Sequence, residues 1–455
     1  MSDSTSATPS AGEGQHAITS IQVCGYKSVH TRQSIAVRPL TLLAGANSSG
    51  KSSIMQPLLL LKQTLEASYD AGVLLLDGPN VRFTSIDQLL SGCARGSQAN
   101  SFSVGLTIGS DFQLTLCFER LAGKGLHIRE MSYESAKEKA SLREGMTSDE
   151  VKALIPSPFR DLKARGEGGK AIVPDWAITP ERCFLGAGMM VEGKRLGREF
   201  PFGISPAGMV EPHVRRLIHL PGLRGNPQRF YPKTAAGSTF PGVFQDYVAS
   251  VVAQWQEADK EKLSRVSRDL RGLGLTWKVV AKAMDDTRVE LQVGRLAQAV
   301  VGGGWDLVNI ADVGFGVSQS LPVVVALHAA AAGQMVYIEQ PEMHLHPKAQ
   351  VAMAKVLADA ANRGVHVVAE THSTLLLLGV QALVARGDLS ATKVKLHWFQ
   401  RAREDGCTQI TSADLDDTGA FGEDWPEDFA ETELKAQSAY LDAAEMRHGE
   451  SKRGE

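Results

Sequence analysis

The stretch Gly45-Ala46-Asn47-Ser48-Ser49-Gly50-Lys51-Ser52 matches the phosphate-loop pattern G-x-x-x-x-G-K-[ST] at every fixed position. An apolar run at residues 40–44 precedes it and a helical pattern at residues 52–67 follows it. The two glycines let the backbone wrap around a phosphate with its N–H groups inward, and Lys51 brings a positive charge to the β and γ oxygens. We prefer this interpretation to a Gly/Ser-rich turn without a ligand. The predicted phosphate-binding residues are Asn47, Ser49, Gly50, Lys51, Ser52 and Ser53.

An acidic side chain ends the apolar strand predicted at residues 335–338. A carboxylate there can reach the Mg²⁺ shell of a bound nucleotide, as can the hydroxyl of the phosphate loop, so Ser52 and Glu339 form the predicted metal site. The H-x-H pair His344 and His346 follows the strand. No third His or Cys is clustered with this pair, which favours a structural turn over a second metal site.

The next predicted strand, residues 365–369, leads into Glu370-Thr371-His372-Ser373. A histidine at the end of a neighbouring strand can hydrogen-bond the γ-phosphate, so His372 is a predicted catalytic residue. The alternative is a surface histidine whose hydrogen bonds are satisfied elsewhere.

A Gly/Ser/Gln-rich loop is predicted at residues 312–320, directly before an apolar helix with Pro322 near its first turn, where proline is tolerated. Backbone donors and a helix N-terminus can bind an anion. Because the phosphate loop already serves the nucleotide of its own chain, we expect this second loop to contact the nucleotide of another subunit. Its predicted contact residues are Gly314, Gly316, Ser318 and Gln319.

Strand and helix patterns alternate at both ends of the 455-residue chain, whereas Gly- and Pro-rich stretches interrupt its middle. Parallel strands can come from distant sequence, so the two ends can share one sheet that the middle interrupts as an insertion. Within the middle, a helix is predicted at residues 243–270 and a hairpin around Asp285 and Asp286. The predicted segments are a disordered tail (1–16), an N-terminal lobe (17–120), an insertion (121–300), a C-terminal lobe (301–402) and an acidic module (403–455).

Charge is unevenly distributed along the chain, although the net charge is only −3. Residues 121–233 hold 19 Lys and Arg against 13 Asp and Glu, whereas residues 403–455 hold 5 against 15. The middle could face an anionic partner such as DNA, and ordinary solvated surface is the alternative. Five scattered cysteines without a CxxC pair, and no long apolar run, predict a cytoplasmic protein without a disulfide framework or a membrane span.

Several of these motifs together resemble the ATPase heads of the RecF, SMC and OLD proteins. They are Gly25-Tyr26-Lys27-Ser28, the phosphate loop (Walker A), Gly314–Gln319 as a signature loop, Glu339–Pro347 as a Walker B end and D-loop, and His372 as a switch histidine. The residues of these motifs are most similar to those of OLD-like ATPases of anti-phage and mobile-element systems. Trp425–Phe429 resembles a C-terminal module of one subgroup. The segment with Leu223 and Arg224 resembles a recurring segment of that subgroup, to which we assign no role from the sequence.

The resemblance implies an ABC-type P-loop ATPase head: an α/β fold with a mixed sheet flanked by helices, and a mixed α+β insertion between Walker A and the signature loop. It implies ATP and Mg²⁺ as cofactors. It also implies a homodimer, or a higher homo-oligomer, in which each ATP lies between the phosphate loop of one chain and the signature loop of the other. The insertion would carry dimerisation or partner contacts. Since no Toprim nuclease domain follows the ATPase motifs, an effector such as a nuclease is expected to be a separate protein.

One residue departs from the ABC pattern. ABC-type enzymes usually place a glutamate after the Walker B acid as the base that polarises the attacking water, and this chain has Gln340 there. An amide can orient water but takes no proton, so slow hydrolysis is expected unless Glu342 or a partner residue supplies the base. Two alternatives stay open: a nucleotide-gated scaffold with little turnover, and a RecF-like DNA-repair clamp.

Overall fold

The computed structural model describes residues 17–92, 98–123, 125–155, 164–165, 171–172, 175–191, 194–195, 206–235, 237–299, 305–422, 438 and 440–441. The predicted tail at residues 1–16, and Trp425–Phe429 of the predicted acidic module, lie outside the described residues. Within the part of the chain that is described, no helix is long and apolar enough to cross a bilayer.

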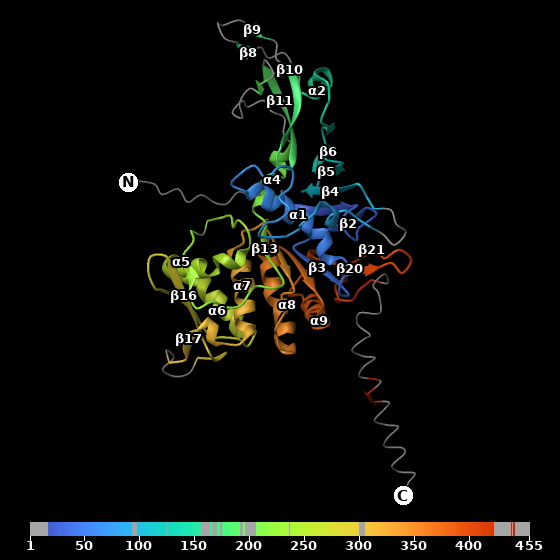
Figure 1. Ribbon diagram of the computed structural model, residues 1–455. Helices are drawn as coiled ribbons and strands as arrows, with labels where there is room; N and C mark the ends of the chain where they lie inside the picture. Colours follow the sequence, from blue (N-terminus) through green and yellow to red (C-terminus); the bar gives the residue numbers. More distant parts are fainter. Residues whose placement is uncertain are drawn as a thin grey trace, which may run out of the picture.

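The core sheet brings both ends of the chain together in the order β13-β18-β19-β3-β20-β21. Its strands are Ile218–Leu220 (β13), Met335–Glu339 (β18), His366–Thr371 (β19), Leu40–Gly45 (β3), Val394–Arg401 (β20) and Thr408–Ala413 (β21). All neighbouring strands are parallel except β20 and β21. The carboxyl ends of β3, β18 and β19 therefore meet at one edge, with β19 between the phosphate-loop strand and the acidic strand (Figure 1).

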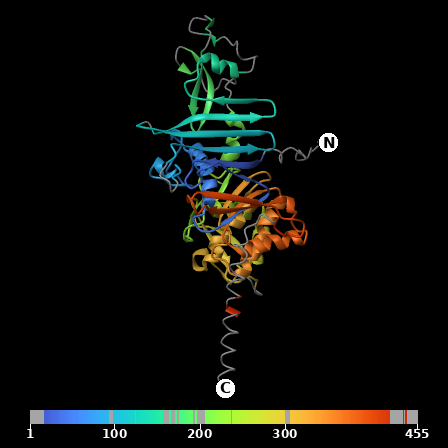
Figure 2. The ribbon, with the colours of Figure 1, turned by 90° about the vertical axis from the view of Figure 1, so that its right-hand side faces the viewer.

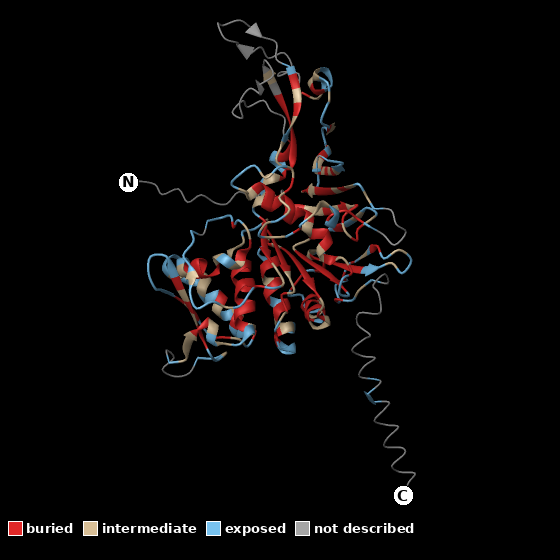
Figure 3. Ribbon diagram, in the orientation of Figure 1, coloured by how far each residue is buried: buried red, intermediate tan, exposed pale blue. Residues whose placement is uncertain are grey.

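Helices cover both faces of the core sheet, which is why its strands are nearly continuous apolar runs. One face carries α1 (Lys51–Glu66), and the other carries α7 (Phe315–Ala329), α8 (Pro347–Asn362) and α9 (Thr374–Ala385) (Figure 1). Alternate residues of β3 separate these layers, because Leu42 packs with α7–α9 and Leu43 packs with α1. Buried residues run through the sheet and the inner helix faces (Figure 3). This confirms the predicted α/β fold with a mixed sheet flanked by helices.

A second, antiparallel sheet packs on the outer side of α1, in the order β2-β1-β4-β5-β6-β7. Its strands are Ile18–Cys24 (β1), Gln33–Ala36 (β2), Ser101–Ile108 (β4), Phe112–Leu121 (β5), Gly125–Ser135 (β6) and Lys139–Leu142 (β7). Ile54 and Leu58 of α1 share one buried cluster with Ile21 and Val104 of this sheet. Figure 2 shows the antiparallel sheet lying above the core sheet, so α1 is enclosed between two layers.

Two hairpins extend from these layers. One pairs β10 (Asp175–Glu181) with β11 (Phe184–Val191) and projects away from the core sheet (Figure 1). The other pairs β15 (Val279–Ala283) with β16 (Arg288–Gly294) and confirms the hairpin predicted around Asp285. The remaining elements are β8 (Ala164–Arg165), β9 (Ala171–Ile172), β12 (Lys194–Arg195), β14 (Tyr231–Pro232), β17 (Leu307–Asn309), α2 (Ser148–Leu154), α4 (Glu211–Arg215) and the 3-10 turns η2 (Ile86–Gln88), η4 (Pro206–Met209), η5 (Phe244–Tyr247), η6 (Ile310–Asp312) and η7 (Ala391–Lys393).

The helix predicted at residues 243–270 is divided in the structure. It forms α5 (Val248–Ala258) and α6 (Lys260–Gly272), because Asp259 begins a new helix by accepting a hydrogen bond from the Lys262 N–H at 3.0 Å. A periodic apolar pattern continues across such a cap, so the pattern alone does not show the break.

The helix after the predicted signature loop also begins earlier than expected. α7 starts at Phe315, and Pro322 consequently lies inside it and not in its first turn. Cysteine usage differs as well: Cys407 is disulfide-bonded, whereas Cys24, Cys117 and Cys183 carry free thiols.

Parts of the range 121–300 belong to the two main sheets. β6 and β7 continue the antiparallel sheet beyond residue 121. Ile218–Leu220 enters the core sheet as β13, beside the acidic strand. A three-residue strand carries too little pattern to be assigned from sequence, and only its pairing with β18 reveals it.

Candidate functional site

A pocket of about 740 Å³ lies at the edge of the core sheet where β3, β18 and β19 end. Its lining comes from parts of the chain that are far apart in sequence. The lining residues are Lys27, Asn47–Ser53, Gln56, Pro221–Leu223, Glu339, Gln340, Met343, Glu370, His372 and Arg401. The structure thus brings all the predicted phosphate-loop residues together with three residues predicted from the second half of the chain, which are Glu339, Gln340 and His372.

The backbone of the phosphate loop can curve around a ligand because two of its positions accept only glycine. Gly45 has φ 145°, and a Cβ there would lie 2.2 Å from the Phe399 carbonyl oxygen. Gly50 has φ 102°, and a Cβ there would lie 2.2 Å from Thr408 Oγ1. Both φ values lie in the left-handed region that glycine adopts without strain. The loop can therefore curve tightly and present its N–H groups.

Neighbouring elements brace the phosphate loop from behind. Thr408 Oγ1 lies 2.8 Å from both Ser28 Oγ and the Ser49 carbonyl oxygen. Arg401 Nε donates to the Ser48 carbonyl at 2.8 Å. The sequence motif that ends in Ser28 therefore has a structural role, which is to support the loop.

Lys51 and Ser49 present groups that fit a phosphate. Lys51 is 5% exposed, and its Nζ donates to the carbonyls of Gly45 at 3.0 Å and Ala46 at 2.8 Å. Burial lowers the pKa of Lys51, an effect that the charge of Glu370 opposes. Ser49 Oγ is buried without a hydrogen-bond partner. A buried cation and an unpaired hydroxyl beside a glycine-lined loop match a polyphosphate ligand.

Two carboxylates end the strands that face the loop. Glu339 and Glu370 are register partners on β18 and β19. Ser52 Oγ donates to Glu370 Oε2 at 2.9 Å, and the Tyr337 hydroxyl donates to the other oxygen of Glu370. The predicted metal pair Ser52 and Glu339 lines the same pocket. The carboxylate in direct contact with Ser52, however, is Glu370, which the sequence analysis did not select.

The surroundings of the two acids shift their pKa values apart. Burial, reinforced by the charge of Glu339, raises the pKa of Glu370 to about 7. Burial also acts to raise the pKa of Glu339, but hydrogen bonds from His219 and from the Gly222 N–H outweigh it and lower that pKa. The pair suits Mg²⁺, which binds through one or two carboxylates together with nucleotide phosphates. Among the described residues, no group of three or more His, Cys, Asp or Glu side chains is arranged to hold a metal.

His219 orients the carboxylate of Glu339. Its buried ring stacks on Tyr337 with a centroid distance of 5.3 Å and an angle of 9°. His219 Nε2 lies 3.3 Å from Glu339 Oε1, and Nδ1 lies 3.1 Å from Asn80 Nδ2. Because an amide nitrogen only donates, Nδ1 accepts and Nε2 carries the proton that faces Glu339. Burial lowers the pKa of His219, in agreement with a neutral ring.

Glu370 makes the stability of the chain depend on pH. Its pKa is about 7 in the folded chain against an ordinary 4.5, so the folded state holds this proton more tightly, and the stabilisation is lost as the pH rises through 7. Glu370→Gln removes the ionisable carboxyl group, and with it this pH-dependent loss of stability. Without nucleotide, we expect this variant to gain on the order of 3 kcal/mol relative to wild type between pH 4 and pH 8.

Denaturant unfolding at a series of pH values measures this difference, with Glu404→Gln as an exposed control. A constant difference between Glu370→Gln and wild type across this range would contradict the raised pKa.

The two residues predicted to act on the attacking water occupy different places. Gln340 lines the pocket, with φ 48° and its N–H donating to the Glu370 carbonyl at 2.8 Å. Glu342 is buried outside the lining, where its Oε1 accepts hydrogen bonds from Thr371 Oγ1 at 2.8 Å and the His372 N–H at 2.9 Å. Glu342 therefore supports the turn that carries His372, and its predicted role as a base stays a prediction.

The predicted signature residues divide into two groups. Gly314 is exposed at the N-terminus of α7, and Gly316 is half-buried. Ser318 and Gln319 are only 8% and 4% exposed. Ser318 Oγ donates within its own helix, and Gln319 Nε2 donates to the Gly225 carbonyl at 2.8 Å. Since α7 begins directly after Gly314, Ser318 and Gln319 are buried at the end of its first turn, and their contact with the nucleotide of another subunit stays a prediction.

The sequence analysis missed three charged residues of the pocket, namely Lys27, Glu370 and Arg401. Glu370 follows a predicted strand directly, as Glu339 does, so two strand-ending acids were a usable signal. Lys27 lies in the motif that ends in Ser28, which was a signal as well. Arg401 offered none, because only the packing of β20 against the loop brings it to the pocket.

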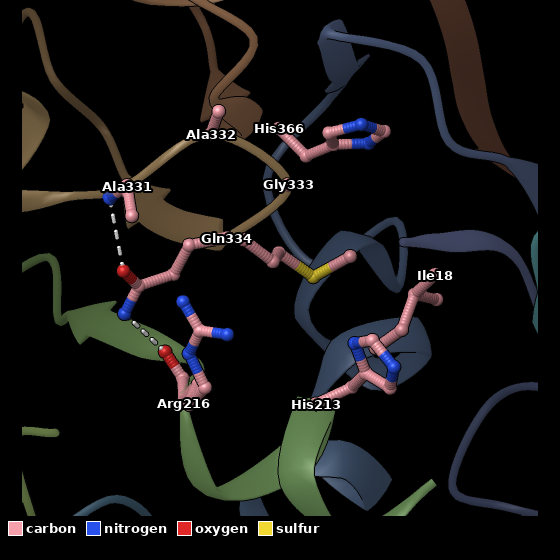
Figure 4. Close-up of a pocket in the computed structure, with 9 residues that line it drawn as sticks. Ile18, His213, Arg216, Ala331, Ala332, Gly333, Gln334 and His366 are labelled. Carbon is pink, nitrogen blue, oxygen red and sulfur yellow. Dashed lines mark hydrogen bonds between the residues drawn. The ribbon is translucent and has the colours of Figure 1, made fainter. Parts of the chain in front are cut away.

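A second cavity, of about 340 Å³, lies at the opposite edge of the core sheet, where β18 and β19 begin. Figure 4 shows His213, Arg216 and His366 around it. Gln334 closes one side, since its side chain accepts from the Ala331 N–H at 3.1 Å and donates to the Arg216 carbonyl at 2.6 Å. None of the predicted site residues lines this cavity, so the predicted chemistry lies at the other edge.

Comparison with known proteins adds one family match and several structural similarities. Residues 236–378 match the family described as "AAA domain, putative AbiEii toxin, Type IV TA system". No curated protein matches the chain.

Three solved structures of SMC heads are similar to the chain. An SMC head bound to the C-terminal winged-helix domain of ScpA is 11% identical, with a TM-score of 0.45, over 88% of this chain and 98% of that one. The SMC head of Thermotoga maritima is 8% identical, with a TM-score of 0.38, over 87% and 98%. An SMC head with an extended coiled coil, bound to the C-terminal domain of ScpA and derived from Pyrococcus furiosus, is 9% identical, with a TM-score of 0.40, over 87% and 96%.

The family match covers Glu339, Gln340 and His372 but not the phosphate loop. The loop enters the same sheet from β3, which pairs with β19 beside the acidic strand. The matched residues and the phosphate loop thus meet at one pocket, and residues 236–378 are similar to the AAA domain that the family describes.

Proposed function

We propose that this chain binds ATP with Mg²⁺ and hydrolyses it slowly, as the switch subunit of a homodimer that controls a separate effector. The observation that supports this is the pocket in which the phosphate loop meets Glu339, Glu370 and His372. Lys51 would neutralise the phosphate oxygens, while the loop N–H groups and the start of α1 bind them. Ser52 and the two carboxylates would hold Mg²⁺, which supplies charge stabilisation to the β and γ oxygens.

Hydrolysis is the slow part of the proposed cycle. Gln340 lines the pocket where a base is expected, and its amide orients water without accepting a proton. Burial and the charge of Lys51 lower the pKa of His372, which favours a neutral ring with a single N–H. That N–H bonds the Gly45 backbone, so donation to the γ-phosphate would replace this hydrogen bond. The same glutamine favours the alternative function, a nucleotide-gated scaffold with little turnover.

Gly314 provides the test of the proposed dimer. We expect Gly314→Glu to weaken ATP-dependent self-association by at least about 10-fold, because the new carboxylate would face the phosphates of the nucleotide in the partner. Gly314 is exposed with φ −62°, and a Cβ there meets no atom within 4 Å, so the fold tolerates the change. Sedimentation velocity with ATP measures association, and titration calorimetry measures ATP binding by the single chain, which should be unchanged.

Gly208→Glu is the matched control for this experiment. Gly208 is also exposed and a Cβ there also meets no atom within 4 Å, but it lies in η4, outside the lining of the nucleotide pocket. This variant should associate as wild type does. Wild-type association of Gly314→Glu would contradict the sandwich dimer.

The regulated process is proposed to be anti-phage defence or DNA maintenance, with a separately encoded effector such as a nuclease. The family match, whose description names a toxin and a type IV toxin–antitoxin system, supports a role of this kind. Turnover measured with and without duplex DNA and the product of the adjacent gene tests it. Stimulation by the neighbouring protein supports the switch, DNA stimulation that falls steeply with salt favours the RecF-like clamp, and turnover indifferent to both contradicts the switch.

A further inference from the structure

Residues 219–225, here called the crossing segment, run between the two halves of the proposed nucleotide machinery. The segment leaves β13, passes the carboxyl end of β18 and reaches the first turns of α7. Pro221–Leu223 line the nucleotide pocket, whereas Arg224 and Gly225 line a separate cavity of about 500 Å³ beside α7. The crossing segment therefore touches both the nucleotide site of its own chain and the helix proposed to face a partner.

On the pocket side, the crossing segment holds the carboxylate of Glu339. His219 Nε2 lies 3.3 Å from one oxygen, and the Gly222 N–H donates to the other at 3.1 Å. Both oxygens thus have a partner from the same segment. The orientation of this acid consequently depends on where the crossing segment lies.

On the helix side, Arg224 joins the strand end to α7. Its Nη2 donates to the Glu339 carbonyl at 2.6 Å and to the Gln340 carbonyl at 3.3 Å. Its Nη1 donates to the Gln319 carbonyl at 3.3 Å, and Gln319 Nε2 returns a hydrogen bond to the Gly225 carbonyl at 2.8 Å. A guanidinium has its donors in a rigid planar fork, which lets one side chain hold three carbonyls in a set geometry.

Burying the charged side chain of Arg224 at this position costs free energy. It is 7% exposed and its Nε has no hydrogen-bond partner. Burial lowers its pKa to about 10, so it stays charged at neutral pH. Among the described residues, no carboxylate forms an ion pair with it, and the charges of Glu339 and Glu342 offset only part of the effect of burial. A buried charge held by carbonyls is poor stabilisation, since an apolar side chain would fill the same space at lower cost.

We infer that Arg224 is a positioning residue that couples the two nucleotide sites, because it ties Glu339 and Gln340 to the position of α7. If the Gly314 end of α7 shifted when it contacted the nucleotide of a partner, the crossing segment would move. Glu339 and Gln340 at the end of β18 would move with it. Coupling is reciprocal, so filling the nucleotide pocket would in turn position α7 for the partner. This inference rests on the proposed function and adds to it how the two sites communicate.

Arg224→Met tests the coupling. The variant should bind ATP as a single chain within about 2-fold of wild type, and should lose at least about 10-fold in kcat and in ATP-dependent dimer affinity. Arg224→Lys should stay impaired, because one ammonium does not reproduce the planar fork. Full recovery in Arg224→Lys would overturn the proposed geometry.

Gln319→Met tests the same coupling from α7, because Gln319 contacts the crossing segment there. It should show the same loss, and the double variant with Arg224→Met should be no worse than either single variant, because the two side chains act through one connection. Fully additive losses would overturn the coupling. This variant also carries the test if Arg224→Met fails to fold.

Arg363→Met is the control for the loss of an arginine–carbonyl bond to α7. Arg363 is exposed and donates to the Leu327 carbonyl at 3.0 Å, so its loss removes an arginine–carbonyl bond from the opposite end of α7. This variant should keep its kcat and its dimer affinity, with thermal unfolding measured for both. Equal losses of kcat in the two arginine variants would refute a special role for Arg224. If the wild-type chain hydrolyses ATP and Arg224→Met does so equally well, only the coupling is refuted. If the wild-type chain binds no ATP, the proposed function is refuted.

Discussion

Lys51→Ala is expected to lower the affinity for ATP by at least about 100-fold and to reduce turnover to background, because the loop loses its positive charge at the phosphates. Lys51 Nζ sits within 3.0 Å of the Gly45 and Ala46 carbonyls and is largely shielded from water. Arg401, another cation of the pocket, is engaged with the carbonyls of Ser48 and Gly406. Titration calorimetry with ATP and Mg²⁺, followed by steady-state turnover, measures both effects.

The same substitution should leave the fold intact. Burial lowers the pKa of Lys51, which means that its charge is disfavoured in the chain without a phosphate. Lys51→Ala should therefore unfold at the same temperature as wild type or a higher one when nucleotide is absent. Lys355→Ala, at an exposed position on α8, serves as the control and should bind ATP normally. Wild-type affinity in Lys51→Ala would mean that the nucleotide does not use this loop.

Gln340→Glu is expected to raise turnover by about 10- to 100-fold, since a carboxylate can take the proton that an amide cannot. The position suits a base, because Gln340 lines the pocket and its N–H is held by the Glu370 carbonyl. The rate should rise with pH as the new acid ionises. Steady-state kinetics at saturating ATP from pH 6 to pH 9 measure the change.

The new carboxylate would stand near Glu339 and Glu370, so its charge also carries a cost. Without Mg²⁺, Gln340→Glu should be less stable than wild type, and the difference should shrink as Mg²⁺ is added. Gln340→Met, which offers neither a base nor an amide, is the control and should not exceed the wild-type rate. A rate in Gln340→Glu equal to that of wild type would contradict the missing-base account and favour the scaffold.

The phosphate loop shows where sequence reasoning works well. Its chemistry depends on consecutive residues, because Gly45, Gly50 and Lys51 act through the conformation of one short turn. Only the tertiary structure shows why both positions require glycine, because Phe399 and Thr408 occupy the space that a Cβ would need. The local pattern thus predicted the loop correctly without showing what enforces it.

The acidic residues show what sequence reasoning does not reach. Glu339 and Glu370 are side by side because β18 and β19 pair in register, a fact that neither strand carries alone. Glu342 is close to Gln340 in sequence, but its carboxylate faces Thr371 and His372 and not the pocket. A side chain one or two residues along a turn can point in any direction, so proximity in sequence does not predict a shared role.

By itself, the amino-acid sequence determined the phosphate loop, the strands and helices around it, and the residues that end β18 and β19, because these depend on local backbone conformation and apolar periodicity. Tertiary structure alone decided which carboxylate meets Ser52, which signature residues are exposed, and where Arg224 lies between Glu339 and Gln319. These features depend on parallel pairing between strands that are hundreds of residues apart and on the resulting burial. Burial sets both the hydrogen-bond partners and the pKa values of the site, and a linear pattern contains neither.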